Sequence, residues 1–159
     1  RSSRTVIDLV PQQYRHLNVF PVGRLDKDSE GLLILTNDGP FTHEILSPKK
    51  HIPKKYFVKV DKEIPQHAVN IFKNGITLSD GYKAMPAELE VLEDCCEAYV
   101  TVCEGKFHQV KRMLAAVERQ VIYLKRVEMG NLQLDETLNK GELRELTLWE
   151  IKKIKSKNN

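Results

Sequence analysis

Hydrophobic and polar positions change most sharply between residues 23 and 39. A charged loop, Gly23–Gly31, runs into four consecutive apolar residues, Leu32–Leu35, and an Asn-Asp-Gly turn follows. A short apolar run bounded by turn residues is typical of a strand that is buried on both faces. We therefore predict a buried strand at residues 32–35, preceded by a polar loop that rigid core anchors at one end.

Alternation predicts a second strand at residues 54–60, with Tyr56 and Val58 facing the core and Lys55 and Phe57 on the other face. Residues 14–23 have the composition of a loop. The other predicted strands are residues 76–78, 87–92, 98–103 and 121–129. Helical signals occur at residues 5–10, 41–46, 65–73 and 107–117, and a capping box, Thr147-x-x-Glu150, predicts a last helix to about residue 155.

This order of elements predicts an α+β fold. Strands outnumber helices and do not alternate regularly with them, which favours a largely antiparallel mixed sheet flanked by short helices. A chain of 159 residues with 41% hydrophobic content is long enough for one domain with its own core. No apolar run approaches the roughly 20 residues that cross a bilayer, and no targeting segment is visible.

The helix predicted at residues 107–117 has two distinct faces. Its apolar face holds Val110, Met113, Leu114 and Val117, and its opposite face holds His108, Arg112 and Arg119. Lys111 lies on the flank between them. On periodicity alone, an ordinary amphipathic helix with a solvated basic face explains this pattern.

Charge permits nucleic-acid binding without requiring it, because the net charge is only +3 and the pI about 8.7. Basic residues gather near residues 49–55, 106–112, 125–126 and 152–157. Each group alone is an ordinary solvated face, but several beside one loop would make a track for phosphates. The cysteines, Cys95, Cys96 and Cys103, lack the spacing of a metal site, and we expect buried, reduced thiols of a cytoplasmic protein.

Composition alone leaves two interpretations of the loop at residues 23–31. Asp26, Asp28 and Glu30 occupy the first, third and fifth positions of a calcium loop, but Ile34 and Asn37 fall where further ligands belong. The commoner interpretation is a polar turn with solvated carboxylates.

Three sequence blocks change this balance. They are Gly23–Gly39, Lys55–Val60 and Glu104–Met113, with Gly141–Thr147 as a further match near the end. Together they resemble the RsuA type of ribosomal RNA pseudouridine synthase, a family of enzymes that isomerise uridine in ribosomal RNA. The blocks occur in the family's order and cover most of the chain.

The resemblance implies a catalytic site that uses no metal and no cofactor. It assigns to Asp26 the carboxylate that acts as nucleophile, or as base at the sugar. Lys111 becomes the expected cation beside it, with Arg112 as the alternative. Tyr56 would stack on the flipped uridine or take part in proton transfer, whereas without the family a core tyrosine with a satisfied hydroxyl is an equally good interpretation.

The resemblance also implies contacts with RNA. The expected RNA-binding residues are Arg24, Lys55, His108, Gln109 and Arg112. Composition alone would instead place Arg24 in a surface salt bridge with Asp28 or Glu30, and Trp149 in core or cap packing. The implied partner is ribosomal RNA or an assembling ribosomal subunit, with no membrane, for a protein that we expect to be a cytoplasmic monomer.

Details favour the small-subunit branch of the family, notably Ser47-Pro48 with His51 and the sequence His-Gln-Val-Lys-Arg-Met. The alternatives are a large-subunit enzyme and a non-catalytic RNA-binding assembly factor on the same scaffold. Glu118-Arg119 stands where relatives usually carry a glycine, so we expect the helix to run through Arg119 and to extend its basic face. We expect residues 1–159 to be a catalytic domain without the family's upstream strand and N-terminal RNA-binding domain.

Overall fold

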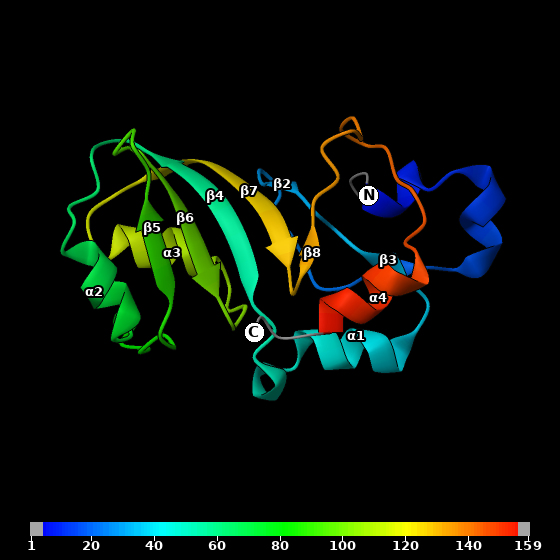
Figure 1. Cartoon of the computed structure of the whole chain (residues 1–159), viewed down its shortest axis with the longest axis horizontal. Coiled ribbons are helices and arrows are strands. Elements are labelled where there is room, and N and C mark those ends of the chain that lie inside the picture. The colour runs from blue at the N-terminus through cyan, green and yellow to red at the C-terminus, as the bar shows by residue number, and fades with distance from the viewer. Residues whose placement is uncertain (1–4, 156–159) are drawn as a thin grey trace.

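The protein is described over residues 5–155 by a computed structural model, in which two packed halves share one long strand (Figure 1). The larger half is a mixed sheet with strand order β2-β7-β4-β6-β5, and β8 pairs with β7 beside this path. Its strands are β2 (Glu30–Gly31), β4 (Lys54–Val60), β5 (Glu88–Val91), β6 (Glu97–Val102), β7 (Val121–Met129) and β8 (Leu132–Gln133). All pairs are antiparallel except β2 with β7, so the predicted α+β class and the largely antiparallel mixed sheet are confirmed.

One face of this sheet carries the larger core. The helices α2 (Ala68–Lys73) and α3 (Gln109–Ala115) pack there against β4, β5 and β6. Val58 and Val60 are at most 2% exposed, and Tyr56 packs partly buried beside them, as the alternation of residues 54–60 predicts. The apolar stripe of the predicted helix is confirmed, because Val110, Met113 and Leu114 enter the same core.

The smaller half surrounds two other helices, α1 (Gly39–Leu46) and α4 (Leu148–Lys155), which lie side by side at the end of β7 (Figure 1). Ile45, Met129 and Ile154 are fully buried there. Short elements complete this half: the 3-10 helices η1 (Val6–Leu9), η2 (Gln12–Leu17) and η3 (Pro48–Lys50), and the strands β1 (Phe20–Pro21) and β3 (Leu35–Thr36). Asp38 caps α1 by accepting a hydrogen bond from the Phe41 amide at 2.9 Å.

The strand predicted at residues 32–35 is wrong. The apolar run instead connects two different sheets: Gly31 pairs with Arg126 of β7, whereas Leu35 pairs with Pro21 of β1. Of the four apolar residues only Ile34 is fully buried, in the smaller core. An apolar run can bury itself as a linker between two cores as well as in a strand, and periodicity does not separate these cases.

Other elements differ at their ends. Residues 14–23, predicted as loop, include part of η2 and the strand β1, and residues 76–78 form only a bridge of Thr77 with Lys83. The helix α2 starts at Ala68 rather than at Pro65, and it ends before Gly75 as predicted. The capping box is confirmed: the Thr147 amide donates to Glu150 at 2.9 Å, and the Glu150 amide donates to Thr147 Oγ1 at 3.1 Å.

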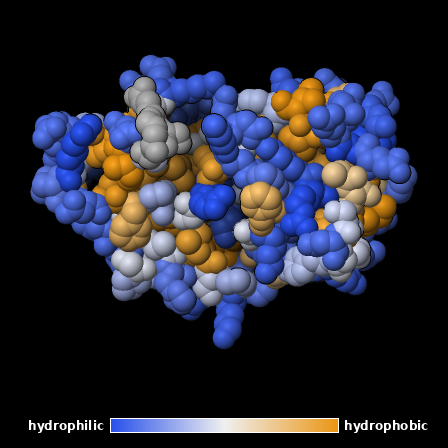
Figure 2. All heavy atoms as spheres, turned by 180° about the vertical axis from the view of Figure 1, so that it is seen from behind, coloured by the Kyte–Doolittle hydropathy of each residue, from blue (hydrophilic) through white to orange (hydrophobic). Residues whose placement is uncertain are grey.

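The surface corrects two further expectations. Trp149 is 67% exposed under the Lys153 ammonium, 4.3 Å from its ring centre, and does not pack in the core. Cys95 is exposed, and Cys96 and Cys103 are half-buried, so none of the three thiols is fully buried. Apolar side chains reach the surface as separate patches among polar ones (Figure 2). Among residues 5–155, none of the helices has the length and apolarity needed to cross a bilayer.

The helix α3 does not run through Arg119, contrary to expectation. It ends at Ala115, and Glu118 adopts a left-handed backbone with φ of 61°. The Arg119 amide then donates a hydrogen bond to the Leu114 carbonyl at 2.9 Å. This bond is typical of helix C-termini at which glycine is the preferred left-handed residue. The Arg119 guanidinium donates to the Glu63 carbonyl at 2.6 Å and so ties the turn to the loop before α2.

Glu118→Gly should therefore stabilise the protein. A non-glycine residue in the left-handed conformation destabilises the folded state by ~1–2 kcal/mol. Glycine removes this strain, but it also raises the entropy of the unfolded chain, which offsets ~0.4–1 kcal/mol of the gain. We expect a net gain of roughly 0.5–1 kcal/mol, or about 2 °C in the melting midpoint. Calorimetry measures it, with Ala115→Gly at an exposed helical position as the control that should destabilise. A midpoint that falls for Glu118→Gly would show that the turn carries no strain.

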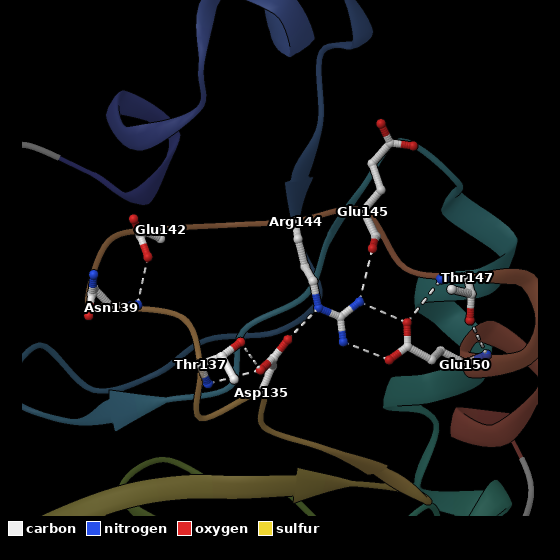
Figure 3. Close-up of polar contacts among 8 residues, drawn as sticks. All are labelled: Asp135, Thr137, Asn139, Glu142, Arg144, Glu145, Thr147 and Glu150. Atoms are coloured by element: carbon white, nitrogen blue, oxygen red, sulfur yellow. Dashed lines mark hydrogen bonds and ion pairs between the residues drawn. The ribbon is translucent and has the colours of Figure 1, made fainter.

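Arg144 ties the segment between β8 and α4 together (Figure 3). Its guanidinium donates to Asp135 at 2.6 Å and to both oxygens of Glu150, at 2.9 and 2.7 Å. Hydrogen bonds from Thr137 and then from Arg144 lower the pKa of Asp135 to about 2. Arg144, followed by the Thr147 amide, lowers the pKa of Glu150 to about 2. This pairing fixes the start of α4 against the segment that precedes it.

These lowered pKa values predict that the free energy of unfolding falls at acidic pH. Both carboxylates bind protons more weakly in the folded state, so their stabilisation is complete above their ordinary values of 3.8 and 4.5 and is lost as the pH falls toward about 2. Arg144→Gln should flatten the decline of the melting midpoint between these pH values, whereas Arg15→Gln, whose side chain donates to the Val10 carbonyl, should not. Parallel curves for wild type and Arg144→Gln would contradict this role.

Candidate active site

Asp26 lies in the loop between β1 and β2, where the chain approaches the edge of the larger sheet. The loop is held at both ends: Val22 is fully buried in the smaller core, and Gly31 pairs with Arg126 in parallel register. Within it, the Ser29 amide donates to the Asp26 carbonyl at 2.9 Å, which closes a turn. The Asp26 side chain is 21% exposed, so its carboxylate is partly shielded yet reachable from solvent.

Two basic side chains, Lys111 of α3 and His108 just before it, converge on this carboxylate. Lys111 Nζ lies 3.7 Å from Asp26 Oδ2, and His108 Nε2 lies 3.5 Å from Asp26 Oδ1. Lys111 also donates a shorter bond of 2.7 Å to Asp28. That hydrogen bond raises the pKa of Lys111 and lowers the pKa of Asp28, so both groups are charged near neutral pH.

The backbone at His108 explains why its side chain reaches the loop. His108 has a left-handed φ of 50° just before α3 begins, and its ring stacks on Phe107 with 3.7 Å between the ring centres. The Phe107 ring is 65% exposed. Helical periodicity placed His108 opposite the apolar stripe, but the residue precedes the helix, so that placement is corrected.

Gln109 is buried rather than open to a ligand. Its amide nitrogen donates to Glu104 at 3.1 Å, and its amide oxygen accepts from the Lys106 backbone at 3.1 Å. Glu104, only 5% exposed, also accepts from the Tyr82 hydroxyl and the Met85 amide, at 2.5 and 2.7 Å. The structure thus places this expected RNA contact inside a polar cluster that orders the loop before α3.

Of the two candidate cations, Arg112 is directed elsewhere. Its guanidinium pairs with Asp80 at 2.6 Å and donates to the Phe107 carbonyl at 3.1 Å. Arg24 is exposed, and within the described part of the chain it forms neither expected salt bridge, since Asp28 pairs with Lys111 and Glu30 with Lys140. Its guanidinium is therefore available for a ligand beside the Asp26 loop.

The two predicted site residues of β4 lie on opposite faces of the sheet. Tyr56 faces the larger core and is the register partner of Arg126 on β7, which in turn is the partner of Gly31. Lys55 faces the other side, with its ammonium 4.5 Å from the Tyr99 ring centre and 3.9 Å from Glu128. Tyr56 thus shares a face of the sheet with α3, and Lys55 does not.

The calcium interpretation is not supported. Asp26 and Asp28 both turn toward the Lys111 ammonium, and Glu30 accepts from Lys140 at 2.7 Å and from Tyr123 at 2.9 Å. Within residues 5–155 no cluster of three or more acidic, histidine or cysteine side chains could hold a metal ion. The cation that pairs with Asp26 and Asp28 is the ammonium of Lys111.

Sequence reasoning missed two buried cations near this site, Lys54 and Arg126. It grouped both with surface basic residues. Alternation contained the signal, because Lys54 shares a face with Tyr56 and Val58, and Arg126 shares one with the buried Leu124.

Comparison with known proteins defines the class. Residues 1–116 match the family described as RNA pseudouridylate synthase, and the chain belongs to this family. A crystal structure of a pseudouridylate synthase superimposes with a TM-score of 0.89 at 37% identity, covering 94% of this chain and 65% of that one.

Individual relatives are bacterial proteins. The chain is 45% identical over 151 residues to the uncharacterized RNA pseudouridine synthase YtzG of Bacillus subtilis, covering 93% of this chain and 63% of the relative. It is 42% identical over 133 residues to the ribosomal small subunit pseudouridine synthase A of Haemophilus influenzae, covering 83% of this chain and 57% of the relative. The chain thus spans about three fifths of the length of these relatives.

Proposed function

We propose that this chain is the catalytic domain of an enzyme that converts a specific uridine of ribosomal RNA to pseudouridine. The observation that carries the proposal is the approach of Lys111 and His108 to Asp26, within 3.7 and 3.5 Å. A pure RNA-binding surface has no use for a carboxylate that repels phosphate. A carboxylate held beside a lysine on a rigid loop is suited to chemistry at a sugar.

The reaction breaks the bond between C1′ of the ribose and N1 of the base, and makes a bond between C1′ and C5. Asp26 supplies the negative charge that starts it, either by attacking C1′ or by removing a proton from the sugar. Lys111 pairs with Asp26, Nζ to Oδ2 at 3.7 Å, and fixes the direction of the carboxylate. Because Asp28 also holds Lys111, the ammonium stays in place when the charge on Asp26 changes.

The target uridine has to leave its stack to reach Asp26. Tyr56, half-buried on the same sheet face as α3, is placed to stack on the flipped base, a contact worth ~1–3 kcal/mol. A hollow of about 410 Å³, bordered by Lys111, Arg119 and Gln120 among others, adjoins the site.

Basic residues around the loop suit phosphate contacts. Arg24 is exposed on the loop itself, His108 stacks with Phe107 at its rim, and Arg112 lies on α3 with a side chain that is 27% exposed. Lys55 would bind RNA only across the opposite sheet face, and Gln109 acts by ordering the loop. We propose that the partner is ribosomal RNA or an assembling ribosomal subunit, met by a monomer in the cytoplasm.

Small-subunit ribosomal RNA is the proposed substrate, because the chain resembles small-subunit synthases from several bacteria. The test measures release of tritium from C5-labelled uridine in small-subunit and large-subunit RNA, each as naked RNA and as assembling particles. We expect release only with the small-subunit substrates. Release from large-subunit RNA alone would favour the large-subunit alternative. Tight binding without release from either would favour an assembly factor.

A further inference from the structure

Two cations lie buried on the sheet face that carries Tyr56. Arg126 is 3% and Lys54 is 6% exposed. On β7, Arg126 pairs with Tyr56 of β4 on one side and with Gly31 of β2 on the other. It therefore lies between the proposed stacking residue and the end of the Asp26 loop. Directly paired residues of neighbouring strands present their side chains on the same face, so Arg126 and Tyr56 share one face of the sheet. Lys54 precedes Tyr56 by two residues and shares that face.

Neither cation is neutralised. Among residues 5–155 no ion pair joins Lys54 or Arg126 to a carboxylate. Arg126 Nε donates to the Leu32 carbonyl at 2.9 Å, but Arg126 Nη2 is buried without a hydrogen-bond partner. Lys54 Nζ has one long bond, 3.3 Å, to the Ile52 carbonyl. Buried charges without counter-charges are costly, so this pair is suited to an incoming anion.

Independent features agree with a local excess of positive charge. Burial, and then the charge of Arg126, lowers the pKa of Lys54. A negative group between them would relieve both effects. The Ser29 hydroxyl, three residues after Asp26, is the other buried side-chain polar atom without a partner among the described residues. The two unsatisfied polar atoms thus belong to Ser29 of the Asp26 loop and to Arg126, which is paired with Gly31 at the end of that loop.

The proposed reaction creates such an anion. When the bond from C1′ to N1 breaks, its electron pair stays on N1 and the base leaves as a uracil anion, with the charge shared by N1, O2 and O4. If Asp26 attacks C1′, the carboxylate becomes a neutral ester; if it takes a proton from the sugar, it becomes a neutral acid. On either route one negative charge moves from Asp26 to the base. C5 of the base then attacks C1′. On the first route this breaks the ester bond and releases the Asp26 carboxylate, and on the second route Asp26 returns its proton to the sugar. The C5 proton leaves to solvent, and N1 gains a proton.

We propose that Arg126, with Lys54 beside it, is a catalytic residue that donates a hydrogen bond to the detached uracil and stabilises its negative charge. This inference rests on the proposed function. Lys111 would stabilise the negative charge while it is on Asp26, and Arg126 would stabilise it after it has moved to the uracil. A planar base edge reaches a guanidinium that is 3% exposed more readily than a phosphodiester, which is tetrahedral and tied to chain on both sides.

The test uses bases that differ as leaving groups. Small-subunit ribosomal RNA is transcribed with uridine or with 5-fluorouridine, whose fluorine makes the departing anion intrinsically more stable. Single-turnover loss of the target nucleoside is followed by digestion and mass spectrometry for wild type, Arg126→Gln, Lys54→Met and the control Lys125→Gln. Lys125 is the neighbouring residue of β7, and its side chain pairs with Glu136.

We expect Arg126→Gln to slow the reaction of uridine roughly 100-fold, the usual effect of removing a donor aimed at developing charge. With 5-fluorouridine the loss should be several-fold smaller, RNA affinity should be unchanged, and Lys54→Met should show the same ordering to a lesser extent. For each variant, the ratio of the rates with 5-fluorouridine and with uridine is measured on one protein preparation. A loss of folded protein lowers both rates equally and leaves this ratio unchanged. Equal losses on both bases would overturn the inference and leave Arg126 as a support for Leu32. Inactive wild type on both RNAs would overturn the proposed function, and this inference with it.

Discussion

Asp26→Asn should abolish isomerisation while the fold and RNA binding persist. Asparagine has nearly the same shape but can neither attack C1′ nor accept a proton, so we expect tritium release to fall roughly 10⁴-fold or more. RNA affinity should stay equal or rise, since the change removes a negative charge near the phosphates. Filter binding and tritium release on one preparation measure both quantities.

Asp28→Asn is the matched control, two residues away in the same loop. Its carboxylate is 77% exposed and also pairs with Lys111. Removing it leaves Lys111 to Asp26 alone, so we expect activity to change less than about tenfold, as for other exposed ion pairs. If Asp26→Asn lost RNA binding together with activity, Asp26 would be a structural residue. If both variants were equally inactive, activity would depend on the conformation of the loop rather than on the chemistry of Asp26.

Gly31→Ala should have the largest effect on stability. Gly31 has a φ of 113°, and an added Cβ would lie 2.1 Å from the Arg126 carbonyl oxygen and 2.6 Å from its amide nitrogen. Both contacts involve backbone of a central strand, which has no room to move. Strain and overpacking together should cost roughly 3–5 kcal/mol, or about 10 °C in the melting midpoint. Thermal unfolding followed by circular dichroism measures the loss.

Gly39→Ala provides the comparison, because an added Cβ there has no atom within 4 Å and its backbone is helical. We expect its midpoint to lie within a degree or two of wild type. Similar midpoints for the two alanine variants would contradict the tight approach of β2 to β7. An intermediate result, in which Gly31→Ala folds but is inactive, would locate the strain in the catalytic loop.

The sequence predicted those parts of the fold that depend on local pattern. The face of β4 with Tyr56 and Val58, the capping box at Thr147 and the apolar stripe of α3 all follow from period and cap chemistry. The short apolar run at residues 32–35 was harder to predict, because it links two cores rather than forming one strand, and this depends on partners far along the chain.

The site shows the same division. Resemblance placed Asp26 and Lys111 in the catalytic blocks, and the structure brings them together, whereas Arg112 turns to Asp80. Residue type misled at Glu118, where the backbone takes the left-handed turn of a glycine, and at Gln109, a polar side chain that is buried. Only a three-dimensional arrangement shows that Arg126 Nη2 has no hydrogen-bond partner within residues 5–155.

The parallel pairing of β2 with β7 sets the order in which a new chain can fold. Asp28 meets Lys111 across 83 residues of sequence, and Leu32 meets Arg126 across 94. Closing such long loops is entropically costly and occurs after local helices and hairpins have formed. The Asp26 loop leaves the ribosome before α3 and β7, so it stays without these anchors until both have been synthesised. Catalytic geometry is therefore among the last features that the growing chain acquires.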